Sequence, residues 1–249
     1  MDRLQQVGDD VYFVRGTAVN WVLLREGADV TLIDSGYPGD LDRLEASIRA
    51  IGSRPEAVRA ILITHAHVDH MGAVTPFHER YGTPVYLDPL EVGHAKREYL
   101  DQLGTMGLLA QLWRPGVLPW ALTIARAGAT KDVAAPHATA FPAPGALDLP
   151  GRPVPVATHG HTAGHSSFHL PDAGIVVSGD ALITGHEVST YEGPQLTAPF
   201  FSKHHEASVA ALDVFTRLDA DVLLPGHGPL RRGSVAEAAE SAKRREHAA

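Results

Sequence analysis

One short segment constrains this chain more than any other: the letters HAHVDH at 65–70, which directly follow the apolar run RAILIT. The run is typical of a strand buried on both faces, and loops at strand ends are where a rigid scaffold presents functional groups. His65 and His67 are two residues apart, so they point to the same side of an extended backbone, whereas Asp69 and His70 can face a second point. Imidazole and carboxylate bind zinc, iron or manganese, so the segment predicts a metal site.

Three further motifs repeat this arrangement, each with a metal-ligand type of residue beside glycine after an apolar run: GHTAGH, SGD and PGHG. They contribute His161, Asp180 and His227. Glycine lets the backbone turn sharply and approach a ligand closely. The chain has 15 histidines and no cysteine, so any metal must be held by imidazole and carboxylate. The absence of cysteine also excludes a disulfide framework and a thiol nucleophile.

Strand and helix patterns alternate around these motifs, and such alternation predicts a layered α/β sandwich. Strands are predicted at Val11–Val14, Asn20–Arg25, Val30–Ile33, Arg59–Thr64, Pro84–Leu87, Leu147–Leu149, Val154–Thr158, Ser166–Leu170, Ile175–Ser178 and Asp221–Leu224. Helices are predicted at Asp40–Ile51, Met71–Tyr81, Glu91–Leu112, Val117–Arg126, Glu206–Leu218 and Ser234–Glu246. The two middle helices form an apolar insert at about 91–130, and a Pro/Ala-rich connector follows at 131–145.

The four motifs, in this order, make the chain similar to the metallo-β-lactamase superfamily over about residues 10–230, and among its members to the glyoxalase II-like hydrolases. The resemblance implies a four-layer αββα sandwich with a two-metal site at one edge of the sheets. We further predict one domain over 1–249 that contains the insert at 91–130, for which a lid over an apolar substrate pocket is one hypothesis. The implied ligands are His65, His67 and His161 for the first metal, Asp69, His70 and His227 for the second, and Asp180 bridging both.

The activity implied by this resemblance is hydrolysis of an ester, thioester or lactone in a small, moderately apolar molecule. Two zinc ions, or iron or manganese, would hold a bridging hydroxide as the nucleophile, and Asp69 would orient it and shuttle its proton. An iron-dependent persulfide dioxygenase is the alternative enzyme, because such relatives use one iron on the first ligand set. A non-catalytic or biosynthetic partner protein that retains the fold is a further alternative. The complete second ligand set favours hydrolysis.

Four residues outside the ligand set are candidates for supporting roles. His165 either hydrogen-bonds near Asp180 or a ligand, or simply packs. Lactonases of the superfamily often place tyrosine after the bridging aspartate, but Ala181 stands there, so Tyr191 is a substitute candidate. Trp113 and Trp120 of the insert are candidates for a substrate pocket, although the insert could also form a homodimer interface or be core. No role is predicted for His78, His94, His137, His169 and His186.

The charge balance and the apolar segments limit the remaining partners. The 21 basic and 29 acidic residues give a net charge of −8, which argues against a nucleic-acid partner. The most apolar window, 104–124, contains Arg114 and two prolines, so no membrane span is predicted. The first ten residues lack the basic start and apolar core of a signal peptide, which favours a cytoplasmic location.

Overall fold

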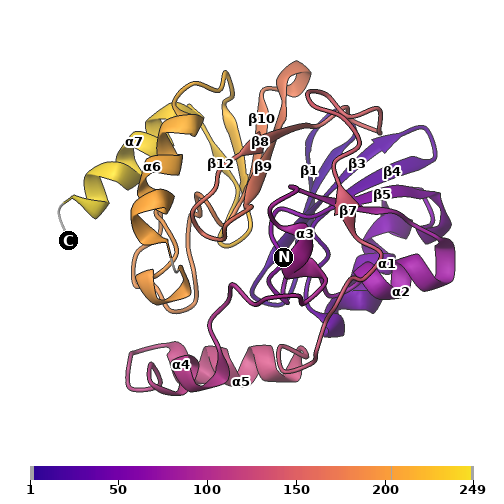
Figure 1. The fold of residues 1–249 in the computed structure, drawn as a ribbon. Helices are drawn as coiled ribbons and strands as arrows, with labels where there is room; N and C mark the ends of the chain where they lie inside the picture. The colour runs from indigo at the N-terminus through magenta and orange to yellow at the C-terminus, as the bar shows by residue number, and fades with distance from the viewer. Residues whose placement is uncertain (1–2, 203, 248–249) are drawn as a thin grey trace.

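The computed structural model describes residues 3–202 and 204–247, and they form two β-sheets packed face to face between helices (Figure 1). The first sheet follows chain order from β1 to β7. Its first four strands pair antiparallel, and β4 to β7 pair parallel. The strands are β1 (Leu4–Gly8), β2 (Val11–Arg15), β3 (Asn20–Glu26), β4 (Asp29–Ile33), β5 (Val58–Leu62), β6 (Val85–Leu87) and β7 (Thr139–Ala140).

The second sheet has the order β12-β11-β10-β9-β8. Its strands are β8 (Val154–Ala157), β9 (Ser166–Leu170), β10 (Ile175–Gly179), β11 (Val222–Pro225) and β12 (Arg231–Arg232). β10 and β11 pair parallel, so their carboxyl ends lie at the same edge. Every residue of these two strands is buried, as expected for mostly apolar parallel strands that are covered on both faces.

Helices cover the outer face of each sheet. α1 (Leu41–Ala50) and α2 (Val74–Tyr81) lie on the first sheet, and α6 (His205–Phe215) and α7 (Val235–Glu246) lie on the second (Figure 1). Separate groups of buried apolar side chains fill the space between α1–α2 and the first sheet, between the two sheets, and between the second sheet and α6–α7. These three apolar interfaces confirm the predicted αββα sandwich.

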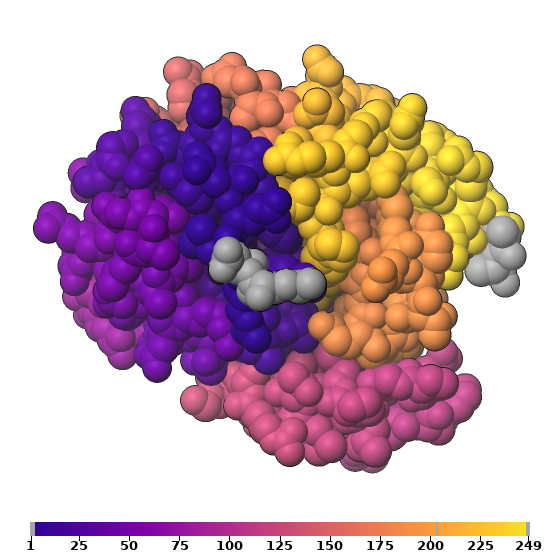
Figure 2. Space-filling model, turned by 180° about the vertical axis from the view of Figure 1, so that it is seen from behind, coloured from indigo at the N-terminus to yellow at the C-terminus, as the bar shows by residue number. Residues whose placement is uncertain are grey.

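The insert contains α3 (Val92–Ala95), α4 (Thr105–Leu109) and α5 (Val117–Arg126), and α4 and α5 lie across one edge of the sandwich (Figure 1). Figure 2 shows this part as a ridge that borders both the N-terminal and the C-terminal halves. One face of α5 buries Trp120 and Ile124 against Tyr37. The opposite face exposes Leu118 and Leu122. The insert is therefore partly core, and the homodimer stays a prediction.

Two predicted elements are wrong. The helix predicted at Glu91–Leu112 is instead the short α3 and α4, because Arg97 adopts a left-handed conformation (φ 63°) that ends the first. The strand predicted at Leu147–Leu149 is absent from the described structure. Leu147 is buried between the sheets, but the chain turns back at Gly151 (φ 77°).

Three short strands at the edges of the sheets were missed: β1, β7 and β12. β1 contains two exposed glutamines, and β7 and β12 have only two residues each, so none has the apolar alternation that identifies a strand. Within the described residues, no helix is both long and apolar enough to cross a membrane.

Candidate metal centre

The structure brings all seven predicted ligand residues together at the carboxyl ends of β5, β8, β10 and β11, where four loops meet. Their donor atoms form three overlapping groups, and within each group these atoms lie within 4.8 Å of one another. The groups are His65, His67 and His161; His65, His70 and Asp180; and Asp69, His70 and His227.

The Asp180 carboxylate lies at the centre of these groups. Its Oδ2 is 3.2 Å from Nε2 of His227, 3.5 Å from Nε2 of His161 and 3.9 Å from Nε2 of His65. Its Oδ1 is 3.4 Å from Nε2 of His70. One carboxylate therefore faces donors of both predicted sets, which is the geometry that a bridging ligand requires.

Each of the five histidines has its second ring nitrogen fixed by a protein group, which leaves the other nitrogen facing the cluster. Such second contacts set the tautomer and the ring orientation of metal-binding histidines. The contacts are His65 Nδ1 with Thr64 Oγ1 (3.1 Å), His67 Nε2 with the Asp101 carbonyl (2.8 Å), His70 Nδ1 with Asp34 Oδ2 (2.8 Å), His161 Nδ1 with Thr197 Oγ1 (3.1 Å) and His227 Nδ1 with the Ala18 carbonyl (2.7 Å).

Several of the inward-facing atoms are buried without a hydrogen-bond partner among the described residues: Nε2 of His65, Nε2 of His70 and Oδ1 of Asp180. Leaving such an atom unsatisfied costs about 1–3 kcal/mol. A divalent cation would satisfy all three, because each atom offers a lone pair when the imidazoles are neutral, as they are in a metal site. The donor set therefore fits the His/Asp type of site that binds zinc, iron or manganese.

The two carboxylates of the cluster, Asp69 and Asp180, stabilise positive charge beside them. Burial favours the neutral imidazole of His227, but Asp180 and Asp69 outweigh burial and raise the pKa of His227 to about 10. Burial likewise disfavours the charged form of Asp69, yet His70 and His227 hold its pKa below the usual range. The centre thus stabilises cations beside two carboxylates, as a metal site must.

Asp34 at the end of β4 supports both ends of the HAHVDH loop, a role the sequence analysis missed. Its carboxylate accepts hydrogen bonds from the backbone N–H and hydroxyl of Thr64 and lies against His70 Nδ1. Asp34 is buried and has a φ of 60°, a left-handed conformation that aspartate tolerates better than most residues. The sequence did show an aspartate at a strand end before Ser35-Gly36, but this pattern is equally typical of an ordinary turn, so it did not indicate a supporting role.

Glu91, at the start of the insert, is a second missed carboxylate, and it joins two of the motif loops. Its oxygens accept hydrogen bonds from the backbone N–H groups of Ala66 and Gly164 and from the hydroxyl of Thr162. Its Oε1 is also 2.8 Å from Nδ1 of the buried His94. Through Glu91, the insert therefore helps to fix the positions of the HAHVDH and GHTAGH loops relative to each other.

His165 contacts Asp180 through the backbone. The backbone N–H of Asp180 donates to His165 Nε2 over 3.0 Å, and His165 Nδ1 lies 2.9 Å from the hydroxyl of Thr158. Burial lowers the pKa of His165 to about 4, so the ring is neutral and its Nδ1–H donates to Thr158. His165 thus holds the chain at Asp180 in place, one of the two roles predicted for it.

Gly226 of the PGHG motif has a steric role. A Cβ at this position would lie 2.3 Å from Oδ1 of Asp180 and 3.0 Å from Cε1 of His70. Any larger residue would therefore displace the central carboxylate, and glycine is required for the close approach.

A cavity of about 490 Å³ opens onto the cluster, with His67, Asp69, His161, Asp180 and His227 on one side. The other lining residues are mostly apolar and come largely from the insert, including Leu103, Leu108, Trp120 and Ile124. Of the three predicted substrate-pocket residues, Trp120 lines this cavity. Trp113 and Tyr191 do not; both line a neighbouring cavity.

His186, which had no predicted role, lines the cavity beside the cluster, with its ring centroid 4.8 Å from that of His227. Burial, and then the charge of His227, lower the pKa of His186 to about 3, so its ring is neutral. The backbone N–H of Val188 donates to Nδ1 over 3.2 Å, and therefore the ring proton sits on Nε2. A histidine in the middle of a loop without a motif gave no sequence signal.

Comparison with known proteins agrees with this fold. The sequence profile of the metallo-β-lactamase superfamily matches residues 14–227. The chain therefore belongs to the metallo-β-lactamase superfamily, as its four motifs indicated. A curated relative, the probable metallo-hydrolase YflN of Bacillus subtilis, is 27% identical over 229 residues, which cover 88% of this chain and 80% of the relative. The probable metallo-hydrolase YqgX of the same organism is 29% identical over 68% of each chain.

Solved structures show the same fold. A metallo-β-lactamase family protein from Thermus thermophilus superposes with a TM-score of 0.69, at 22% identity, over 96% of this chain and 80% of its own. At this identity the likeness concerns the fold alone.

Proposed function

We propose that this protein is a dinuclear metal-dependent hydrolase that cleaves an ester, thioester or lactone bond in a small, moderately apolar molecule. The observation that carries the proposal is the central Asp180 carboxylate, which faces histidines of both ligand groups while their outer nitrogens are fixed by protein groups. Relatives named as probable metallo-hydrolases support the class of reaction.

The residues divide into two ligand sets joined by Asp180. His65, His67 and His161 would hold one divalent ion, and Asp69, His70 and His227 the other, with zinc as the proposed metal in both. When bound, the two ions supply hydroxide at neutral pH by lowering the pKa of water toward ~7, and they polarise a carbonyl group.

Asp69 is the proposed catalytic acid–base group. Its carboxylate lines the cavity and its side chain is 14% exposed, so it reaches both a water molecule and a substrate. In the reaction, water adds to the carbonyl carbon and the bond to the leaving oxygen or sulfur breaks. Asp69 would carry the proton that water loses to the leaving group.

The cavity walls would position the substrate. The apolar side, with Trp120 and Leu108, would take the acyl part and exclude water. The Nε2–H of the neutral His186 would donate to the carbonyl oxygen as negative charge develops on it. His186 thereby takes the place that the sequence analysis gave to Tyr191.

Elemental analysis of the purified protein tests this function, together with a panel of chromogenic esters, thioesters and lactones. We expect close to two zinc ions per chain, hydrolysis of one bond class, and loss of turnover with a chelator that zinc restores. His227→Ala should lower the metal content toward one per chain, whereas His159→Ala should not, because His159 contacts Asp88 outside the cluster. One iron per chain, without hydrolysis but with oxygen uptake in the presence of a persulfide, would instead identify a dioxygenase.

A further inference from the structure

A second cavity, of about 840 Å³, lies on the far side of His186 and Thr197 from the histidine cluster. These two residues line both cavities. Thr197 Oγ1 is 3.1 Å from His161 Nδ1, and the ring centroid of His186 is 4.8 Å from that of His227, with the two rings tilted by 47°. The two cavities therefore share a wall that lies directly beside the candidate metal centre.

The second cavity is basic, although the whole chain carries a net charge of −8. Arg114, Arg244 and Arg245 line it, and none of them forms an ion pair with a carboxylate in the part of the chain that the structure describes. The acidic side chain at its border, Glu246, is instead 3.1 Å from His205 Nε2. Three arginines from two distant segments thus face one space without a partner anion.

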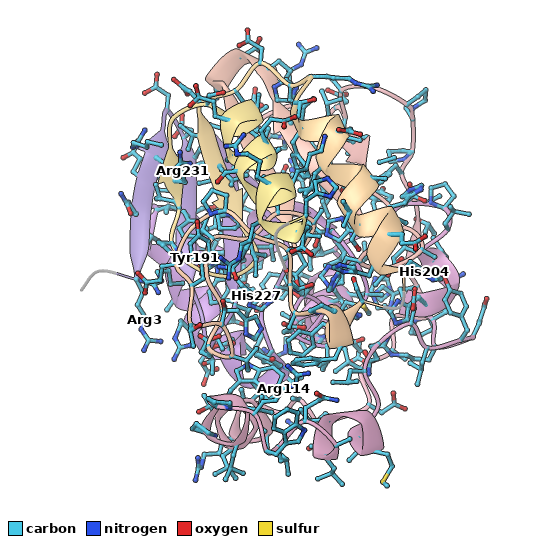
Figure 3. The ribbon with its side chains drawn as sticks, turned by 90° about the vertical axis from the view of Figure 1, so that its left-hand side faces the viewer. Arg3, Arg114, Tyr191, His204, His227 and Arg231 are labelled. Atoms are coloured by element: carbon cyan, nitrogen blue, oxygen red, sulfur yellow. The ribbon has the colours of Figure 1, made fainter. Side chains whose placement is uncertain are left out.

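Aromatic rings orient two of these arginines. The guanidinium carbon of Arg114 lies 5.0 Å from the ring centroid of Trp113 and 5.4 Å from that of Phe200, and that of Arg245 lies 3.9 Å from the ring of Tyr191. Figure 3 shows Arg114 at the junction between the insert and the rest of the molecule, below Tyr191 and His227. Arg114 Nε donates to Gln111 Oε1 over 2.8 Å, so its terminal N–H groups are the ones that can bind phosphate or carboxylate.

We propose that this cavity binds a phosphate or carboxylate group on the leaving part of the substrate, while the acyl part occupies the apolar cavity. The proposal rests on the proposed function and narrows it to an ester or thioester with an anionic leaving part. It also gives Trp113 and Tyr191 a role, because they hold the arginines that contact the anion. Arg114 and Arg245 are then binding residues that select the substrate.

A binding experiment tests the anion site without relying on turnover. Phenyl phosphate and benzoate are titrated calorimetrically into the metal-loaded protein and its Arg114→Ala and Arg245→Ala variants, all with equal metal content. We expect each variant to bind the preferred anion about tenfold more weakly, the loss of one charge-assisted hydrogen bond. The matched control is Arg126→Ala, an exposed arginine of α5 outside both cavities, which should bind as the wild type does.

Equal affinity in the wild type and both cavity variants would overturn the proposal, because the anion would then bind elsewhere, for example on the metals. Absence of binding of both anions to the wild type at millimolar concentration would overturn it as well. Preference for phenyl phosphate or for benzoate would distinguish a phosphorylated from a carboxylated leaving part.

A turnover experiment separates this proposal from the proposed function. The S-butyryl thioesters of thiophenol and of 4-mercaptobenzoate differ only in a carboxylate on the leaving part. Arg114→Ala should raise KM about tenfold more for the charged thioester than for the neutral one, and an equal change would contradict the anion site. The two proposals can fail separately. If neither thioester is hydrolysed but anion binding still depends on Arg114 and Arg245, the hydrolysis of thioesters is contradicted and the anion site is supported.

Discussion

The strand-end loops and the insert border the same cavity, but their side chains are held in different ways. In the loops, each cluster histidine has an outer contact of 2.7–3.1 Å, and the carboxylates of Asp34 and Glu91 fasten the backbone around them. In the insert, α5 is held mainly by one apolar face, and large side chains such as Met106 and Trp113 are 77% exposed.

Because of this difference, we expect the loops to determine the reaction and the helices of the insert to determine which substrates bind. Hydrogen bonds fix ring orientations, so the loops can present metal ligands with the accuracy that coordination needs. Apolar contact is non-directional, so α4 and α5 can change their lining residues without disturbing the centre. Substitutions in the loops should therefore affect metal binding and turnover, and those in α4 and α5 should affect stability and KM.

The largest effect is expected for Asp69→Ala in the HAHVDH loop. Removal of the acid–base group should lower kcat by about 10²–10⁴-fold, while the circular dichroism spectrum stays unchanged. Steady-state kinetics on the best substrate measure the effect, and Asp172→Ala, at an exposed aspartate, serves as the control. A loss of less than tenfold would reject the proposed role of Asp69.

Trp120→Ala tests the buried face of the insert. Trp120 is 8% exposed and lies 5.4 Å, between ring centroids, from both His186 and Phe201. Its truncation should lower the free energy of unfolding by about 3 kcal/mol, as measured by urea denaturation. KM should also rise more for long acyl chains than for acetyl substrates. Unchanged stability would mean that α5 is not held by this face.

Asp34→Ala tests the support of the HAHVDH loop. Losing the contact with His70 Nδ1 should weaken metal affinity by about 10–100-fold, measured in competition with a chromophoric chelator. Asp34→Asn keeps an acceptor oxygen and a side chain that tolerates the left-handed backbone, so it should weaken affinity less. Equal losses in both variants would show that the negative charge, and not the hydrogen bond, supports the metal.

The smallest effect is expected for Trp113→Ala, at the exposed end of the insert. Because the side chain is 77% exposed, the free energy of unfolding should change by no more than about 0.5 kcal/mol. KM for a neutral substrate should also rise less than in Trp120→Ala. Matching losses of stability in the two tryptophan variants would remove the distinction between the buried and exposed faces.

The sequence by itself determined which residues are candidate donors and which segments form strands and helices around them. Every predicted ligand residue lies at a strand end, because apolar runs identify buried strands and the residues that directly follow them stay near the end of the strand. The same periodicities indicated the individual strands and helices, and the resemblance carried by the four motifs implied their arrangement as two sheets between helices. The spacing of residue types along the chain is enough to predict single strands, helices and motifs, because each depends on only a few neighbouring residues.

Only the tertiary structure decided which distant groups support these donors. Asp34, the Ala18 carbonyl and Thr197 contact histidines that are 36, 209 and 36 residues away in the chain. His186 and the arginines Arg114 and Arg245 likewise acquire their surroundings from segments far apart in sequence. These contacts form only when whole layers pack together, so they cannot be predicted from the residues that neighbour each histidine in the sequence.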